Sequence, residues 1–135
     1  MLQFAAPPTV YLVDDDLIVL AFVEAVLGAA GYRVERFTGG EGVLDLAAAS
    51  PPALFILDVR MPAVDGIELL KQLRALEACR ETPVLMLTGS GRLDRIALAM
   101  QAGATDFLMK PFTPEQVTAK ARMMIEPSPI PQHPL

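Results

Sequence analysis

The sequence predicts a single α/β domain in which five parallel strands alternate with five helices. Short apolar runs recur along the 135 residues, and each is followed by a stretch with apolar residues at helical spacing. The third run, Leu54–Leu57, is uninterrupted and is followed by Asp58, which is typical of a strand buried on both faces of a parallel sheet. Strict alternation with short connections places helices on both faces of that sheet. A closed eight-unit barrel would need about 200 residues and is excluded.

The first two strands and the helix between them have clear boundaries. Val10–Val13 is apolar, and a helical pattern then covers residues 17–30 and stops at Gly31. Asp16 suits the N-cap of that helix, and Gly31 suits its C′ position. The second strand, Arg33–Phe37, alternates polar and apolar residues, so we expect it at an edge of the sheet and the other strands inside.

The later elements follow from capping residues and glycine stops. Val84–Leu87 and Asp106–Met109 are the fourth and fifth strands, and Gly103 ends a helix that lies between them and begins near Leu93. A capping-box spacing precedes three helices. The pairs, with the predicted helix ends, are Thr38 and Glu41 (about Ala49), Asp65 and Glu68 (about Leu76), and Thr113 and Gln116 with Pro114 at N1 (about Ile125).

These elements favour one sheet topology and one domain. With the second strand at an edge, we expect a (βα)5 domain of the flavodoxin-like order 2-1-3-4-5, which reverses direction between strands 1 and 3. We expect an N-terminal extension over residues 1–8, the domain over 9–125, and a tail over 126–135. Four prolines in the tail predict an extended segment or a linker.

Composition excludes several classes of protein. The net charge of −5 argues against binding of nucleic acid by this domain itself. No segment approaches the roughly 20 apolar residues of a membrane helix, and the first residues do not resemble a signal peptide. The single cysteine, Cys79, excludes an internal disulfide and suits a cytoplasmic protein.

Three carboxylates are predicted to meet at the carboxyl ends of two neighbouring strands. Asp14 and Asp15 follow strand 1, and Asp58 follows strand 3. Like charges this close raise one another's pKa unless a cation neutralises them, and a few carboxylates with waters and a phosphate suit Mg²⁺. Taken alone, Asp14 and Asp15 fit turn and cap positions equally well.

A hydroxyl group and an ammonium group follow the other two strands. Thr88 follows strand 4 and Lys110 follows strand 5. A metal ion, a hydroxyl and an ammonium group would together surround a phosphoryl group on a carboxylate, as in aspartyl-phosphate chemistry. Singly, Thr88 fits the start of a turn and Lys110 fits a solvated loop. The four strand ends together favour phosphoryl transfer to Asp58.

With these residues in place, the sequence resembles the receiver domain of bacterial two-component response regulators over residues 9 to about 125. The resemblance rests on motifs in the family's order: Val13-Asp14-Asp15-Asp16, Leu57-Asp58-Val59-Arg60-Met61-Pro62 with Asp65-Gly66, Leu87-Thr88-Gly89, Ala102-Gly103-Ala104, and Asp106-Phe107-Leu108-Met109-Lys110-Pro111-Phe112.

The resemblance implies a phospho-acceptor switch of a phosphorelay. Asp58 would accept a phosphoryl group from a sensor histidine kinase or a histidine phosphotransfer protein. Asp15 and Asp58 would bind Mg²⁺ (or Mn²⁺) directly, with Asp14 acting largely through water and the Arg60 carbonyl as a main-chain ligand.

The resemblance also implies how the switch is transmitted. Thr88 and Lys110 would bind the phosphoryl oxygens, and the Lys110–Pro111 peptide bond would be cis. Phe107 would be the switch aromatic that turns inward when Thr88 moves towards the phosphate; an ordinary half-buried aromatic is the alternative. The surface of the fourth helix, fifth strand and fifth helix would then rearrange, to control an output domain or partner or to form a homodimer.

Two other functions are weaker. A Mg²⁺-dependent aspartyl-phosphate phosphohydrolase is the alternative, but haloacid-dehalogenase-like enzymes expect a second acid two residues after the nucleophile, where this chain has Arg60, and we find no cap domain. Nucleotide binding through Gly89-Ser90-Gly91 lacks a full glycine-rich fingerprint. We therefore expect no enzyme activity beyond self-phosphorylation and autodephosphorylation.

Overall fold

The computed structural model describes residues 6–61, 65–89 and 93–126. The predicted tail from Pro127 onwards, most of the predicted N-terminal extension, Pro62 of the third-strand motif, and the Ser90-Gly91 part of the glycine-rich loop lie outside the described residues. Within the described part of the chain, no helix has the length and apolar character that crossing a membrane requires.

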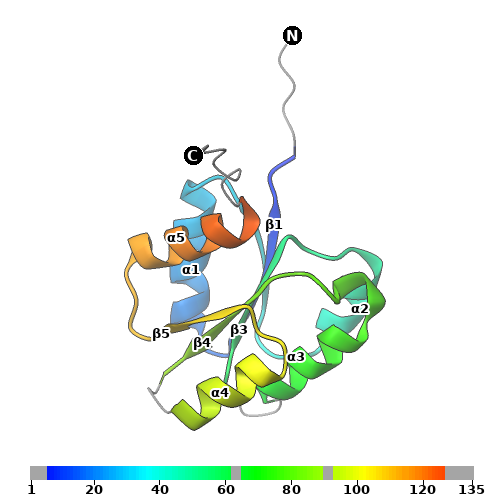
Figure 1. Cartoon of the computed structure of the whole chain (residues 1–135). Helices are drawn as coiled ribbons and strands as arrows, with labels where there is room; N and C mark the ends of the chain where they lie inside the picture. The colour runs from blue at the N-terminus through cyan, green and yellow to red at the C-terminus, as the bar shows by residue number, and fades with distance from the viewer. Residues whose placement is uncertain (1–5, 62–64, 90–92, 127–135) are drawn as a thin grey trace, which may run out of the picture.

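Five parallel strands form one sheet in the order β2-β1-β3-β4-β5, as predicted (Figure 1). The elements, in chain order, are β1 (Thr9–Val13), α1 (Leu17–Ala29), β2 (Arg33–Phe37), α2 (Val43–Ala49), β3 (Leu54–Asp58), α3 (Gly66–Ala75), a 3-10 turn η1 (Glu77–Cys79), β4 (Val84–Thr88), α4 (Leu93–Gln101), β5 (Asp106–Met109) and α5 (Pro114–Ile125).

Helices cover both faces of the sheet, and the sheet divides the core in two (Figure 1). Alternate residues of each strand point to opposite faces: Leu12 packs with the α1 residue Leu20 and the α5 residue Val117, whereas Tyr11 packs with α2 and α3. Every residue of β3 is buried, as the unbroken apolar run predicts. β3 and its neighbour β4 are buried along their whole length, and Asp58 is the last residue of β3.

One prediction about the sheet edges is wrong. β2 is an edge strand, as expected, but β5 is the opposite edge rather than an inside strand. Of its four residues only Leu108 is buried, because the outer side of β5 has no neighbouring strand and its two faces are only partly covered. Phe107 and Met109 consequently lie closer to solvent than the residues of the inner strands.

The predicted N-caps form at α1, α3 and α5, but of the three predicted capping boxes the described residues form a full box only at α5, and Asp65 with Glu68 gives a simple cap. Asp16 and Asp65 accept hydrogen bonds from the backbone N–H groups of Ile18 and Ile67, and Thr113 and Gln116 form the predicted capping box of α5. The box predicted from Thr38 and Glu41 does not form. α2 begins only at Val43, after Gly42 at φ +81° and without a side-chain cap; this left-handed residue turns the chain into the helix, a conformation that glycine adopts at little cost.

Candidate functional site

The carboxyl ends of four strands bring the predicted site residues together. Asp14 follows β1, Asp58 ends β3, Thr88 ends β4 and Lys110 follows β5. β1 pairs with β3, β3 with β4 and β4 with β5, all in parallel. These residues therefore lie together at the end of the sheet where the strands have their carboxyl ends. This is where open α/β sheets place their binding sites.

The three acids form a group that could hold a metal ion. One carboxylate oxygen from each of Asp14, Asp15 and Asp58 lies within 4.8 Å of the others. Asp14 is fully buried and Asp58 is 5% exposed, whereas Asp15 is exposed. Asp14 is fixed from two sides, because its N–H donates to the Phe37 carbonyl at 3.0 Å and its Oδ1 accepts the Asp16 N–H at 2.9 Å. Because Asp14 and Asp58 are buried and Asp15 is exposed, a cation bound by all three acids would have one side facing solvent.

Lys110 is the cation that joins the two buried acids. Its Nζ donates to Oδ2 of Asp14 at 3.1 Å and to Oδ1 of Asp58 at 3.2 Å. Burial would lower the pKa of Lys110, but the hydrogen bond with Asp14 and the charges of both acids raise it above its usual value. The ammonium group therefore stays charged. The backbone N–H of Lys110 donates to the Thr88 carbonyl at 2.8 Å, and the Lys110–Pro111 bond is cis.

The pKa of Asp58 is raised to about 6. Burial is the largest cause, the charge of Asp14 adds to it, and Lys110 offsets part of the rise. Asp58 is thus a carboxylate near neutral pH, but it holds its negative charge at a cost in free energy. A cation bound to the acids would relieve that cost.

Gly66 is a site residue to which the sequence assigned only a turn. A Cβ atom on it would lie 1.9 Å from the carbonyl oxygen of Asp58, closer than any real contact. Its N–H donates to the Val59 carbonyl at 2.9 Å. The start of α3 therefore lies directly against the backbone of Asp58. The Asp65-Gly66 pair after the strand was the available signal, but nothing in it showed which backbone the glycine approaches.

The remaining predicted residues lie around this centre. Thr88 is buried on the strand next to Asp58. Phe107 is half-buried and packs against the core on the α2–α3–α4 side of the sheet. Arg60 is exposed. The site thus combines three carboxylates, an ammonium group and a hydroxyl, a set suited to transfer of a phosphoryl group rather than to proton transfer.

Comparison with known proteins gives one consistent family. The profile described as the response regulator receiver domain matches residues 10–122. The chain is 37% identical over 110 residues to the transcriptional regulatory protein FixJ of Bradyrhizobium diazoefficiens (82% of this chain, 53% of FixJ). It is 40% identical over 118 residues to the transcriptional regulatory protein CreB of Escherichia coli (87% of this chain, 50% of CreB). The chain therefore spans about half the length of these relatives.

Two solved structures agree in fold with this chain over nearly the whole of their own length. A putative response regulator from Chloroflexus aurantiacus superposes with a TM-score of 0.84 at 36% identity, covering 88% of this chain and 98% of that one. The chemotaxis protein CheY4 of Vibrio cholerae superposes with a TM-score of 0.82 at 33% identity, covering 89% and 99%.

Proposed function

The chain belongs to the response regulator receiver domain family of phosphorelay signalling switches, and on that premise we propose that Asp58 is the residue that accepts the phosphoryl group. One observation carries the assignment. Asp58 is the buried acid that lies next to both Asp14 and Lys110, at the end of the central strand. Its pKa, raised to about 6, still leaves it a carboxylate at neutral pH, which is the form that attacks phosphorus.

The transfer we propose begins on a phosphohistidine of a sensor kinase or a histidine phosphotransfer protein. A carboxylate oxygen of Asp58 attacks the phosphorus, a P–O bond forms, and the P–N bond breaks with its electron pair returning to the histidine nitrogen. Lys110 Nζ, 3.2 Å from Asp58 Oδ1, neutralises charge on the phosphoryl oxygens, and Thr88 binds one of them. The protein contributes position and electrostatics, which is most of what this reaction needs.

The donor set suits a hard divalent cation such as Mg²⁺ or Mn²⁺. All three acidic side chains offer oxygen, and their oxygens lie within 4.8 Å of one another. We assign direct ligation to Asp15 and Asp58, a water-mediated role to Asp14, and a main-chain ligand to the Arg60 carbonyl. The bound cation would neutralise charge on the carboxylates and the incoming phosphoryl group.

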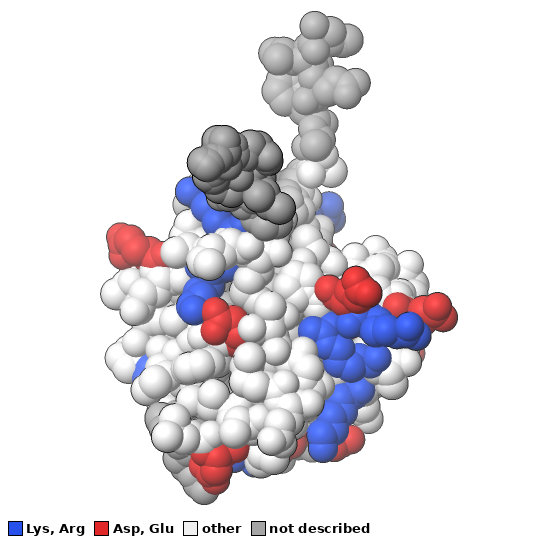
Figure 2. All heavy atoms as spheres, viewed as in Figure 1, with Lys and Arg blue, Asp and Glu red and all other residues white. Residues whose placement is uncertain are grey.

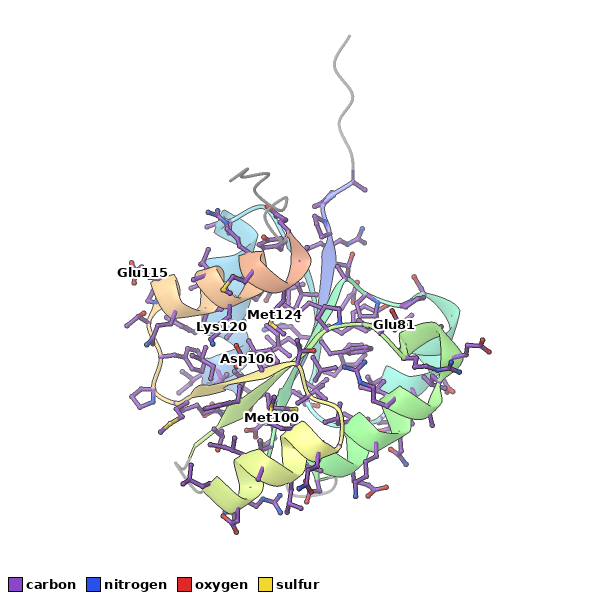
Figure 3. The ribbon with its side chains drawn as sticks, in the orientation of Figure 1. Glu81, Met100, Asp106, Glu115, Lys120 and Met124 are labelled. Atoms are coloured by element: carbon purple, nitrogen blue, oxygen red, sulfur yellow. The ribbon has the colours of Figure 1, made fainter. Side chains whose placement is uncertain are left out.

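We propose that the output is a changed surface over α4, β5 and α5, with Thr88 and Phe107 as the switch residues. Exposed apolar side chains on it include Leu93, Met100 and Met109, and the face seen in Figure 2 is mostly uncharged over these elements. Figure 3 shows the Lys120 and Asp106 side chains meeting between α5 and β5, where Nζ lies 2.5 Å from Oδ2. Such a surface suits an output domain, a partner or a second copy of the chain. We assign the domain to the cytoplasm, where its free cysteine, Cys79, would stay reduced.

Asp58→Asn is expected to abolish covalent phosphorylation. Wild-type protein incubated with acetyl phosphate and Mg²⁺ should gain one labile phosphoryl group per chain in an intact-mass spectrum, and Asp58→Asn should gain none. Asp45→Asn, an exposed acid in the first turn of α2, is the matched control and should behave as wild type. Equal labelling of Asp58→Asn would contradict the assignment, and rapid turnover of many phosphomonoesters would favour the phosphohydrolase instead.

Asp15→Asn is expected to weaken Mg²⁺ binding by at least about tenfold, since even supporting residues of metal sites cost that much. Titration calorimetry at pH 7.5 measures it. Asp16→Asn is the control. It removes one charge next to the site while asparagine can keep the cap on the Ile18 N–H, so its Mg²⁺ affinity should fall less than that of Asp15→Asn. Equal affinity of Asp15→Asn and wild type would remove Asp15 from the ligand set.

A further inference from the structure

Each end of α4 is held to a neighbouring segment by a different arginine. At its first turn, Arg95 donates from NH2 to Oδ1 and Oδ2 of Asp65, at 3.2 and 3.0 Å. Asp65 is also the N-cap of α3, through the Ile67 N–H. α3 and α4 lie side by side (Figure 1). The Arg95–Asp65 pair therefore ties the start of α4 to the start of α3.

The other end of α4 is fixed by Arg74 of α3. Its Nε and NH2 donate to the Gly103 carbonyl at 3.0 and 2.8 Å. Its NH1 donates to the carbonyls of Cys79 and Thr82 at 2.8 and 2.6 Å. One half-buried guanidinium thus joins the turn after α4 to the segment that precedes β4. Charge-assisted bonds to several carbonyls at once make this end the firmer one.

Little packing holds α4 between these two points. Ala99 is its single buried residue, and Leu93, Leu98 and Met100 are exposed. An element with few buried apolar contacts opens at low cost in free energy. The contacts at its two ends therefore have a large share in fixing its position.

The Arg95 contact is weaker than the Arg74 contact in a specific way. Arg95 Nε is buried and has no hydrogen-bond partner among the described residues, whereas Arg74 uses Nε and both terminal nitrogens. An unsatisfied buried donor costs free energy. The closed Arg95–Asp65 pair therefore carries a cost in free energy that an open state, in which that N–H reaches water, would not carry.

The two partners of the pair are attached to different parts of the phospho-acceptor site. Asp65 is fixed to Asp58, because the adjacent Gly66 lies against the Asp58 carbonyl and donates to the Val59 carbonyl. Arg95 lies in the first turn of α4, the helix that follows Thr88 in the chain. The ion pair therefore joins the segment that lies against the Asp58 backbone to the helix that follows Thr88 in the chain.

We propose that the Arg95–Asp65 pair is a latch on α4, that the turn held by Arg74 is its pivot, and that phosphorylation at Asp58 opens the latch. The opening step rests on the proposed function, whereas the latch itself does not. Arg95 is in this scheme a positioning residue that sets how readily the start of α4 moves. A partly exposed ion pair of this kind shifts such an equilibrium by about two- to fivefold.

Amide hydrogen exchange of the unphosphorylated protein tests the latch. Arg95→Gln should speed exchange at residues 97–100 about two- to fivefold and leave the amides of Ala102 and Ala104, which bond to Leu98 and Ala99, unchanged. Asp65→Asn, which keeps an oxygen for the Ile67 cap, should give the same increase, and the double variant should add nothing further. Arg95→Lys should restore slow exchange.

Arg36→Gln, which breaks the exposed pair with Glu24, is the control and should leave the exchange of α4 unchanged. No change in Arg95→Gln, or equal acceleration at both ends of α4, would overturn the latch.

Beryllofluoride with Mg²⁺, a stable phosphoryl mimic, tests the coupling. In wild type it should speed exchange at residues 97–100, and in Arg95→Gln it should add less than about twofold, because the latch is already open. Binding that leaves α4 exchange unchanged would overturn the coupling while the proposed function stands. If beryllofluoride changed amide exchange in wild type no more than in Asp58→Asn at any position in the chain, the proposed function and the coupling would both be overturned. The exchange measurement without beryllofluoride would still decide the latch.

Discussion

Replacing Gly66 with alanine is expected to lower the free energy of unfolding by about 3 kcal/mol, at the upper end of what overpacking costs. The new Cβ would lie 1.9 Å from the carbonyl oxygen and 2.9 Å from the carbonyl carbon of Asp58, and 3.1 Å from Cα of Val59. All three are backbone atoms of the site, so no side chain can rotate away. Either α3 or the end of β3 must shift, and we expect Mg²⁺ affinity to fall with stability. Urea denaturation followed by circular dichroism measures the first effect, and calorimetry the second.

Gly28→Ala is the matched control for this substitution. Gly28 lies in the last turn of α1, and nothing is within 4 Å of a Cβ placed on it. Alanine there should stabilise the protein by about 0.5–1 kcal/mol, because glycine is the poorer helix former. If both alanine variants were as stable as wild type or more so, the close approach of α3 to Asp58 would be refuted.

Asp58→Asn is expected to stabilise the metal-free protein at pH 7.5 by up to about 3 kcal/mol. The pKa of Asp58 rises from 3.8 to about 6 on folding, and a pKa difference of one between the folded and unfolded states corresponds to about 1.36 kcal/mol. The folded state therefore binds a proton more tightly than the unfolded state. That contribution to stability is fully present below pH 3.8 and is lost as the pH rises through about 6. Asparagine resembles the protonated side chain and does not lose it.

The advantage of Asp58→Asn should consequently fall to about half at pH 5. Urea denaturation in EDTA at both pH values measures this, with Asp45→Asn as a control whose effect should not depend on this pKa. Saturating Mg²⁺ should stabilise wild type more than Asp58→Asn and narrow the gap, since a ligand stabilises the state that binds it. A variant no more stable than wild type at pH 7.5 would show that the buried charge of Asp58 carries no such cost.

The sequence alone predicted the elements whose signals are local. An unbroken apolar run marks β3 as buried on both faces, alternation marks β2 as an edge, and Thr113 with Gln116 marks the start of α5. The same kind of signal failed at Thr38 and Glu41, where the left-handed Gly42 placed the helix start further along the chain. Sequence spacing cannot distinguish a capping box from a turn with the same residues, because the outcome depends on backbone conformation.

The strand ends also allowed the sequence to predict which residues the structure brings together at the site. In a parallel sheet of this order all carboxyl ends lie at one edge, so Asp14, Asp58, Thr88 and Lys110 could be placed together from strand positions alone. Four strand ends that each carry a polar group suited to one reaction are a stronger signal than any one of them.

Only the tertiary structure decided which of these groups touch and what holds the elements around them. Lys110 bonds to Asp14 and Asp58 across 96 and 52 residues, and Arg95 meets Asp65 across 30. Gly66 takes its importance from a backbone approach that no spacing rule describes. Local patterns determine the strands and helices because neighbouring residues set backbone conformation, whereas contacts between distant residues depend on how the finished layers pack.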